Sequence, residues 1–92
     1  MSELRQSVTI VNKRGLHARA SAKFVGAVAA IEADVRIAVG KDGHQAAGGS
    51  ILGLMMLGAA KGDTVEVVVE GDGAQPVLDE LVALIADGFG EE

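Results

Sequence analysis

The sequence predicts a small α+β domain in which three helices cover one face of a mostly antiparallel, four-stranded sheet. Apolar and polar residues alternate in four segments, as is typical of strands with one buried face. In three other segments the apolar residues recur at helical spacing. The 92 residues suffice for one modest core, so we expect residues 1–92 to form a single domain. Because the strands alternate, the second face of the sheet should stay exposed to water, which makes the fold an open-faced β-sandwich.

The predicted strands are identified by apolar residues at every second position. In the first of them, Leu4, Val8 and Ile10 share one face. Polar or glycine-rich segments follow two of the strands and predict a turn at Asn12–Gly15 and a hairpin turn at Gly40–Gly43. The four predicted strands span Leu4–Val11, Asp34–Val39, His44–Ala47 and Thr64–Glu70.

The predicted helices each carry an apolar stripe. The first runs from Ala18 to about Ile31 and the last from about Ala74 to about Asp87. Between them, Ile51–Leu57 forms a short helix with Ser50 as its N-cap and Gly58 as its C-terminal stop. The order of elements is therefore strand, helix, strand, strand, helix, strand, helix.

Composition excludes several kinds of site. The chain has no cysteine, and its two histidines, His17 and His44, do not make a closed zinc site by themselves, so we expect no metal. The sequence has no nucleotide- or cofactor-binding motif, so we expect no cofactor. Phe24 and Phe89 are the only aromatic residues, too few for a platform that stacks nucleic-acid bases. Because no signal region or long apolar segment is present, we expect a cytoplasmic protein that does not enter the membrane.

Charge is distributed unevenly along the chain. Residues 1–23 carry five Lys or Arg and one acidic residue, whereas the other 69 residues carry three basic and twelve acidic residues. The net charge of −5 argues against duplex nucleic acid as a partner. The basic N-terminal quarter remains compatible with a small anion or an acidic protein surface.

The run Gly15–Arg19 is the strongest candidate for chemistry. It follows a predicted turn and opens a helix, where the backbone N–H groups of Ala18 and Arg19 are free to bind an anion. In its neutral form, an imidazole such as that of His17 is a good nucleophile. The Arg19 guanidinium could pair with phosphoryl oxygens. Together these groups describe a site that accepts a phosphoryl group, although a histidine N-cap beside a surface arginine explains the spacing equally well.

Two longer runs resemble one protein family. Residues Gly15–Phe24 resemble the phosphorylation site of the histidine-containing phosphocarrier protein (HPr) of the bacterial phosphotransferase system. Residues Gly49–Gly58 resemble the regulatory-serine segment of the same family, and Ala59–Asp63 continue the similarity. Both runs stand at the family's spacing, and the predicted order of elements matches its fold. The resemblance covers nearly the whole chain and implies the HPr type of open-faced β-sandwich.

The resemblance implies a phosphoryl carrier that is a substrate of enzymes and not itself an enzyme. His17 aligns with the histidine that phosphorylated enzyme I modifies on a ring nitrogen and that passes the group to an enzyme IIA. Arg19 aligns with the arginine that attends the phosphoryl group. Ser50 aligns with the serine that an HPr kinase/phosphorylase modifies in some bacterial lineages. Ala20 departs from the family's common proline and therefore keeps its backbone N–H.

The short predicted helix has more large apolar residues than one buried stripe requires. If Leu54 and Leu57 point to the sheet, the others are left partly exposed. Isolated exposed apolar residues are common on small domains, but the resemblance implies a docking surface for partner proteins. The implied docking residues are Ile51, Leu52, Met55 and Lys23.

Two alternative functions belong to other classes. The first is a regulatory interaction module, because Leu84–Glu92 resembles the nitrogen-related branch of the family, which signals instead of importing sugar. The sequence leaves the pathway and the accepting enzyme IIA open. The second is an RNA-binding sheet, which is disfavoured because the predicted strands contain no aromatic residue. We therefore expect no binding to nucleic acid. We also expect the protein to be a monomer.

Overall fold

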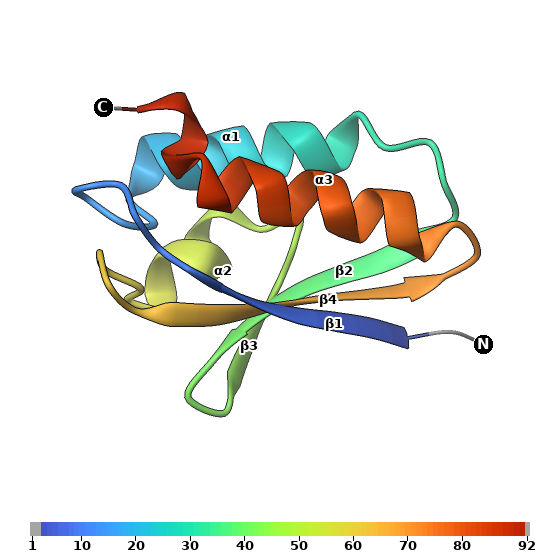
Figure 1. Cartoon of the computed structure of the whole chain (residues 1–92), viewed down its shortest axis with the longest axis horizontal. Helices are drawn as coiled ribbons and strands as arrows, with labels where there is room; N and C mark the ends of the chain where they lie inside the picture. The colour runs from blue at the N-terminus through green and yellow to red at the C-terminus, as the bar shows by residue number, and fades with distance from the viewer. Residues whose placement is uncertain (1–2, 92) are drawn as a thin grey trace.

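The computed structural model describes residues 3–91 and contains the predicted mixture of strands and helices (Figure 1). In chain order the elements are β1 (Glu3–Thr9), α1 (Ala18–Ala29), β2 (Val35–Lys41), β3 (His44–Ala47), α2 (Ile51–Met56), β4 (Thr64–Gly71), α3 (Ala74–Ala86) and a short 3₁₀ helix, η1 (Gly88–Gly90). The predicted order of strands and helices is confirmed, and η1 is an addition to it. None of the helices within residues 3–91 is both long and apolar enough to cross a bilayer.

The strands form one antiparallel sheet in the order β1-β4-β2-β3. β4 lies between β1 and β2, and its alternate residues Val65, Val67 and Val69 are fully buried. The register places Leu4 opposite Val69 and Val8 opposite Val65, so the apolar residues of the two strands share one face. A central position in the sheet therefore explains why β4 is the most valine-rich strand.

The helices all lie on the face of the sheet that carries these valines (Figure 1). α3 packs across β1 and β4, and α1 contacts both α2 and α3. Phe24 of α1, Leu54 of α2 and Leu81 of α3 are fully buried. Burying an apolar side chain of this size stabilises the fold by about 2 kcal/mol. This arrangement confirms the predicted α+β open-faced sandwich.

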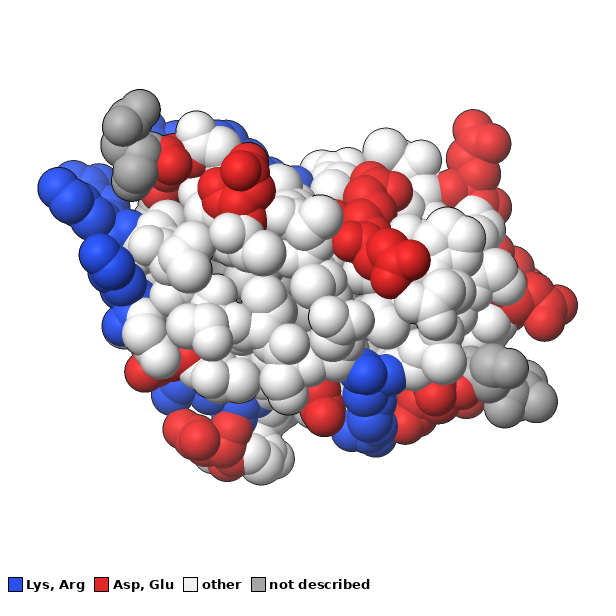
Figure 2. All heavy atoms as spheres, in the orientation of Figure 1, with Lys and Arg blue, Asp and Glu red and all other residues white. Residues whose placement is uncertain are grey.

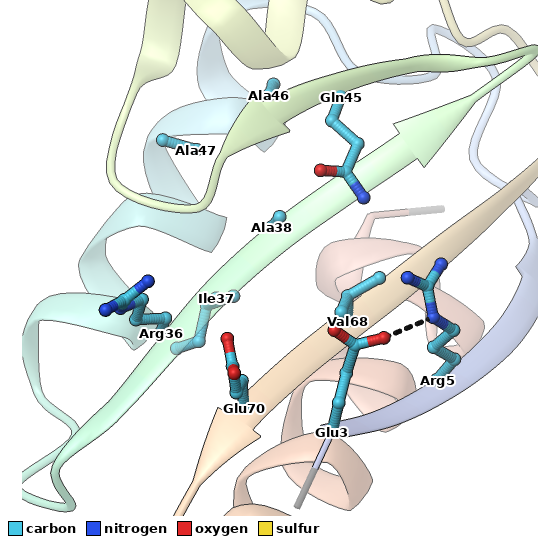
Figure 3. A pocket seen from close by; sticks show the side chains of 10 residues that line it. All are labelled: Glu3, Arg5, Arg36, Ile37, Ala38, Gln45, Ala46, Ala47, Val68 and Glu70. Carbon is cyan, nitrogen blue, oxygen red and sulfur yellow. Dashed lines mark hydrogen bonds and ion pairs between the residues drawn. The ribbon is translucent and has the colours of Figure 1, made fainter. Parts of the chain in front are cut away.

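The opposite face of the sheet is open and mostly polar, as the alternation predicts. It carries a shallow hollow of about 410 Å³ over its middle strands (Figure 3). At one edge of the hollow the Arg5 guanidinium pairs with the carboxylates of Glu3, at 2.7 Å, and Glu66, at 2.8 Å. These charges are exposed, so the pairs stabilise the fold little. The hollow is lined by Glu3, Arg5, Arg36, Ile37, Ala38, Gln45, Ala46, Ala47, Val68 and Glu70.

Several predicted boundaries are wrong by a few residues. β1 ends at Thr9, two residues before the predicted end. The Ile10 N–H still donates to the Asp63 carbonyl, but the Ile10 carbonyl accepts from the Gly62 N–H, so the regular pairing with β4 stops there. β2 continues through Lys41, so the hairpin turn is formed by Asp42 and Gly43 alone. Both residues have positive φ, 52° and 83°, as a two-residue turn of the type I′ class requires.

The helix ends differ in the same way. α1 stops at Ala29, so Ile31 contributes to the core from the following loop. α2 stops at Met56 with Leu57 as its C-cap, and Gly58 follows with φ 66°, which fits its predicted role as the stop. α3 begins at Ala74 and ends at Ala86, one residue before the predicted end.

Candidate functional site

The loop between β1 and α1 is held against the loop that precedes β4. The Leu16 N–H donates to the Ala59 carbonyl at 3.0 Å, and the Leu16 side chain is buried. Gly15 has φ 61°, and a Cβ at this position would lie 2.2 Å from the Ala59 carbonyl oxygen. Only glycine fits such a close approach in a left-handed conformation. The two loops together fix where the chain enters α1.

His17 is the N-cap of α1. Its backbone is extended, with φ −75° and ψ −179°, and its Nδ1 accepts a hydrogen bond from the Arg19 N–H at 3.1 Å. On the other edge of the ring, Nε2 lies 3.0 Å from Oε2 of Glu91. A nitrogen that accepts an N–H carries no proton, and a nitrogen facing a carboxylate donates one. These partners therefore assign the ring proton to Nε2 and leave Nδ1 unprotonated, with its lone pair accepting the Arg19 N–H.

Glu91 and Asn12 also belong to this site, although no local sequence pattern marks either of them as a site residue. The Asn12 amide is 2% exposed, and its Nδ2 donates to the Gly15 carbonyl at 2.8 Å and to Oε1 of Glu91 at 3.2 Å. Burial raises the pKa of Glu91, but hydrogen bonds from Asn12 and His17 and the nearby charges lower it more, so this pKa lies below its ordinary value. The carboxylate beside His17 is therefore charged at neutral pH.

A tight turn after α3 brings Glu91 to the start of α1, where it contacts His17. Gly88, Phe89 and Gly90 have consecutive positive φ values of 65°, 59° and 74°. A left-handed conformation costs a residue such as phenylalanine about 1–2 kcal/mol. Burial of the Phe89 ring and a 2.8 Å hydrogen bond from Lys23 Nζ to the Phe89 carbonyl offset this cost. We call residues 88–91 the C-terminal strap.

Exposed basic side chains lie at the start of α1 and in the loop before it. Arg19 is exposed in the first turn of α1, and Lys13 and Arg14 are exposed in the preceding loop. Figure 2 shows Lys and Arg side chains gathered at the end of the molecule where this loop lies in Figure 1. Acidic side chains occupy much of the other end of the same view. The basic and acidic residues that are separated along the sequence are thus also separated in space. An anion would approach His17 through a favourable electrostatic potential.

Ser50 is the N-cap of α2, as predicted, and its Oγ accepts a hydrogen bond from the Gly53 N–H at 2.9 Å. Leu54 is buried, whereas Leu52 and Met56 are 69% and 77% exposed. The predicted docking residues Ile51 and Met55 are also exposed. An apolar surface therefore follows Ser50 directly along the helix.

The remaining predicted residues have other surroundings. Lys23 is exposed, and its ammonium group donates a hydrogen bond to the Phe89 carbonyl in the C-terminal strap. Its role in docking partner proteins stays a prediction. His44 is an exposed residue at the start of β3, where it lines a hollow with Arg5 and Lys41; within residues 3–91 it makes no hydrogen bond or ion pair with the His17 site. Within residues 3–91, no cluster of three or more His, Asp or Glu side chains is arranged to hold a metal ion.

Known proteins are similar to this chain in sequence and in fold. Residues 4–87 match the family described as "PTS HPr component phosphorylation site". Phosphocarrier protein HPr of Cupriavidus necator is 43% identical over 88 residues, which cover 96% of this chain and 97% of that protein. Phosphocarrier protein NPr of Shewanella violacea is 40% identical over 91 residues, which cover 99% of this chain and 98% of that protein.

A solved structure gives the same result in three dimensions. HPr-C-His from Thermoanaerobacter tengcongensis matches with a TM-score of 0.86 and 39% identity, covering 100% of this chain and 99% of the other. The family match extends over strands, helices and the His17 loop alike. The chain therefore belongs to the HPr family of the phosphotransferase system.

Proposed function

We propose that His17 accepts a phosphoryl group, derived from phosphoenolpyruvate, from phosphorylated enzyme I in the cytoplasm and passes it to an enzyme IIA. The observation that carries this proposal is the environment of the ring. Nδ1 has its lone pair at the N-terminus of α1, while Nε2 faces the Glu91 carboxylate. Nδ1 is therefore the acceptor atom. The positive end of the helix dipole and the basic surroundings favour an anion there.

The transfer requires alignment and charge neutralisation more than acid–base groups. As the lone pair of Nδ1 binds phosphorus, the Arg19 N–H loses its acceptor and becomes available to a phosphoryl oxygen. The N–H of Ala18 is the second backbone donor proposed for the group. The exposed Arg19 guanidinium supplies positive charge as well. A small carrier can work in this way if each partner protein supplies the remaining walls of the reaction site.

The apolar surface of α2 would be the docking site. Ile51, Leu52 and Met55 are exposed, and methionine adapts to different partners. Lys23 lies on α1, which packs against α2. An acidic, partly apolar surface on enzyme I or on an enzyme IIA would complement these residues. The chain is proposed to act as a monomer.

An intact-mass measurement tests the proposed function. The protein is incubated with phosphoenolpyruvate and enzyme I, and we expect one added phosphoryl group. Mild acid should remove it, because a phosphohistidine contains a P–N bond. The absence of any addition, or an addition that survives acid, would contradict the carrier function.

Replacing Arg19 by alanine should slow the transfer without abolishing it. The backbone donors at the start of α1 remain, so we expect a decrease of about tenfold in the rate constant with enzyme I. Arg36→Ala is the matched control, since Arg36 is an exposed arginine on the open face of the sheet. Rapid-quench kinetics measure both variants. Equal rates for Arg19→Ala and the control would reduce Arg19 to a surface charge.

Ser50 is proposed as a regulatory phosphorylation site for an HPr kinase/phosphorylase. A negative charge at the N-cap of α2 suits the helix dipole, but it would border the exposed Ile51 and Leu52. We therefore expect Ser50→Asp to lower the rate of phosphorylation by enzyme I about tenfold, while the melting temperature holds or rises.

Ser50→Ala is the control for this variant. It removes the cap hydrogen bond and should cost about 1 kcal/mol in the free energy of unfolding, yet leave the transfer rate unchanged. Thermal unfolding and transfer kinetics on both variants separate the two effects. Parent-like transfer by Ser50→Asp would mean that Ser50 is a cap and nothing more.

A second candidate function is regulation in the nitrogen-related branch. The Shewanella violacea relative named NPr is nearly as similar to this chain as the Cupriavidus necator relative named HPr. Both similarities support phosphoryl transfer through His17, and they leave two kinds of acceptor protein to compare. The phosphorylated protein can be offered to a sugar-type and a nitrogen-type enzyme IIA in parallel. Faster transfer to the nitrogen-type protein would favour the regulatory function.

A further inference from the structure

Two adjacent methionines are exposed at the end of α2. Met55 and Met56 are 40% and 77% exposed, whereas the preceding residue, Leu54, is fully buried. The chain has no cysteine, and its third methionine, Met1, lies outside the described residues. Within residues 3–91, sulfur chemistry is therefore confined to these two thioethers. Exposed thioethers are open to attack by small oxidants such as hydrogen peroxide.

The two methionines border the most exposed leucine of the proposed docking surface. Leu52 is 69% exposed, and Met55 and Met56 follow it by three and four residues on the same helix. Residues at these spacings are neighbours on a helix surface. Met55 also follows the exposed Ile51 by four residues. A partner surface that covers Leu52 would therefore contact both thioether side chains.

α2 is held in place without help from the two methionines. Leu54 is fully buried, and Leu57, the C-cap, packs against the same core. At the other end of the helix, Ser50 Oγ accepts the Gly53 N–H at 2.9 Å. A chemical change at exposed side chains that do not anchor the helix should leave the fold intact. Its effect should fall on the surface that partners contact.

We propose that Met55 and Met56 form a reversible redox site, at which oxidation by hydrogen peroxide weakens the docking of partner proteins. This inference rests on the proposed function, because it concerns the surface to which enzyme I would bind. In the reaction, a lone pair of the thioether sulfur forms a bond to one peroxide oxygen, and the O–O bond breaks. The second oxygen takes up the proton of the first and leaves as water. Sulfur loses two electrons, and the peroxide gains them.

The reverse reaction makes the site a switch. A methionine sulfoxide reductase removes the oxygen as water, while two thiols of the reducing system are oxidised to a disulfide. The protein itself needs no thiol for either direction. The two directions thus require only a peroxide and a thiol-dependent reductase.

The sulfoxide would change binding and leave the transfer chemistry unchanged. A thioether is apolar and adapts to different partners, whereas a sulfoxide is polar and accepts hydrogen bonds. When a partner covers the surface, the sulfoxide oxygen loses water and gains no matching donor, which lowers the affinity about tenfold. The acceptor, His17, lies at the start of α1 and not on α2. We therefore expect KM to rise about tenfold and kcat to stay within about twofold.

The experiment compares the protein before and after treatment with hydrogen peroxide. The peroxide is removed before enzyme I and phosphoenolpyruvate are added, and peptide mapping locates the added oxygen atoms. We expect one oxygen on each of Met55 and Met56, with Met56 reacting faster because it is more exposed. The melting temperature should change little, which shows that the treated protein is folded. Incubation with methionine sulfoxide reductases should restore the KM of the untreated protein.

The double variant Met55→Leu/Met56→Leu is the matched control. Leucine has nearly the volume of methionine but cannot take up oxygen. Each protein is compared with its own untreated form, so an effect of the substitutions themselves cancels. Met1 is present in both proteins, so any effect of its oxidation appears in both. We expect treatment to leave the KM of the double variant unchanged.

Three results would overturn this inference. One is an unchanged KM in parent protein that carries oxygen on both methionines. Another is the same rise of KM in the treated double variant, which would place the damage elsewhere. The third is a folded protein in which Met55 and Met56 take up no oxygen. If the untreated protein accepts no phosphoryl group, the proposed function fails; failure of the redox site alone leaves that transfer intact.

Discussion

His17→Ala should accept no phosphoryl group from enzyme I, while its fold stays intact. The imidazole supplies the nucleophile, and no other described side chain stands at the same helix end with a free ring nitrogen. The structural effect should be modest, because the lost side chain makes two hydrogen bonds, one with the Arg19 N–H and one with Glu91, each worth about 1 kcal/mol. Intact mass after incubation with phosphoenolpyruvate and enzyme I measures the first effect, and thermal unfolding measures the second.

His44→Ala serves as the control for this variant. His44 is an exposed histidine at the start of β3, outside the His17 site, so its removal should leave phosphorylation complete. A His17→Ala protein that still gains a phosphoryl group would identify another residue as the acceptor. Loss of phosphorylation in both variants would instead indicate that enzyme I was inactive in the assay.

Gly15→Ala should destabilise the fold strongly, although it adds only one methyl group. A Cβ would lie 2.2 Å from the Ala59 carbonyl oxygen, so the two loops must separate. The left-handed conformation of an alanine costs about 1–2 kcal/mol, and breaking the hydrogen bond between Leu16 and Ala59 adds about 1 kcal/mol. For a domain of this size, the melting temperature should fall by more than about 10 °C.

Gly43→Ala separates the steric effect from the conformational one. Gly43 also has a positive φ, 83°, but a Cβ there would meet nothing within 4 Å. We expect this variant to lose only about 1 kcal/mol. Calorimetry on the two variants compares them directly. If both lose the same stability, the close approach of the two loops does not constrain the chain.

Most of the fold could be predicted from local patterns in the sequence. Alternation identified all four strands, and the helical stripes with the Ser50 cap identified all three helices. The errors lie at element ends, where tertiary contacts decide. Where β1 ends, the Ile10 carbonyl accepts from the Gly62 N–H, a contact between residues far apart in the chain that leaves no local signal.

The candidate site could be predicted only in part. His17 and Arg19 stand out because a helix start, a nucleophile and a cation occur within five residues. The sequence around Asn12 predicts only a turn, and Leu84–Glu92 shows a family resemblance but no chemical motif. Their contact depends on the left-handed turn at Gly88–Gly90, which brings the chain end back to α1. The one available signal was an apolar Phe89 between two glycines, which predicts a turn with a buried anchor.

The most direct test of the central claim is a phosphorus–nitrogen NMR correlation on isotopically labelled, enzymatically phosphorylated protein. Because the ring proton is assigned to Nε2 by Glu91 and the lone pair to Nδ1 by Arg19, we expect phosphorus to couple to Nδ1 of His17. A coupling to Nε2, or to a nitrogen of any other residue, would contradict the proposed mechanism.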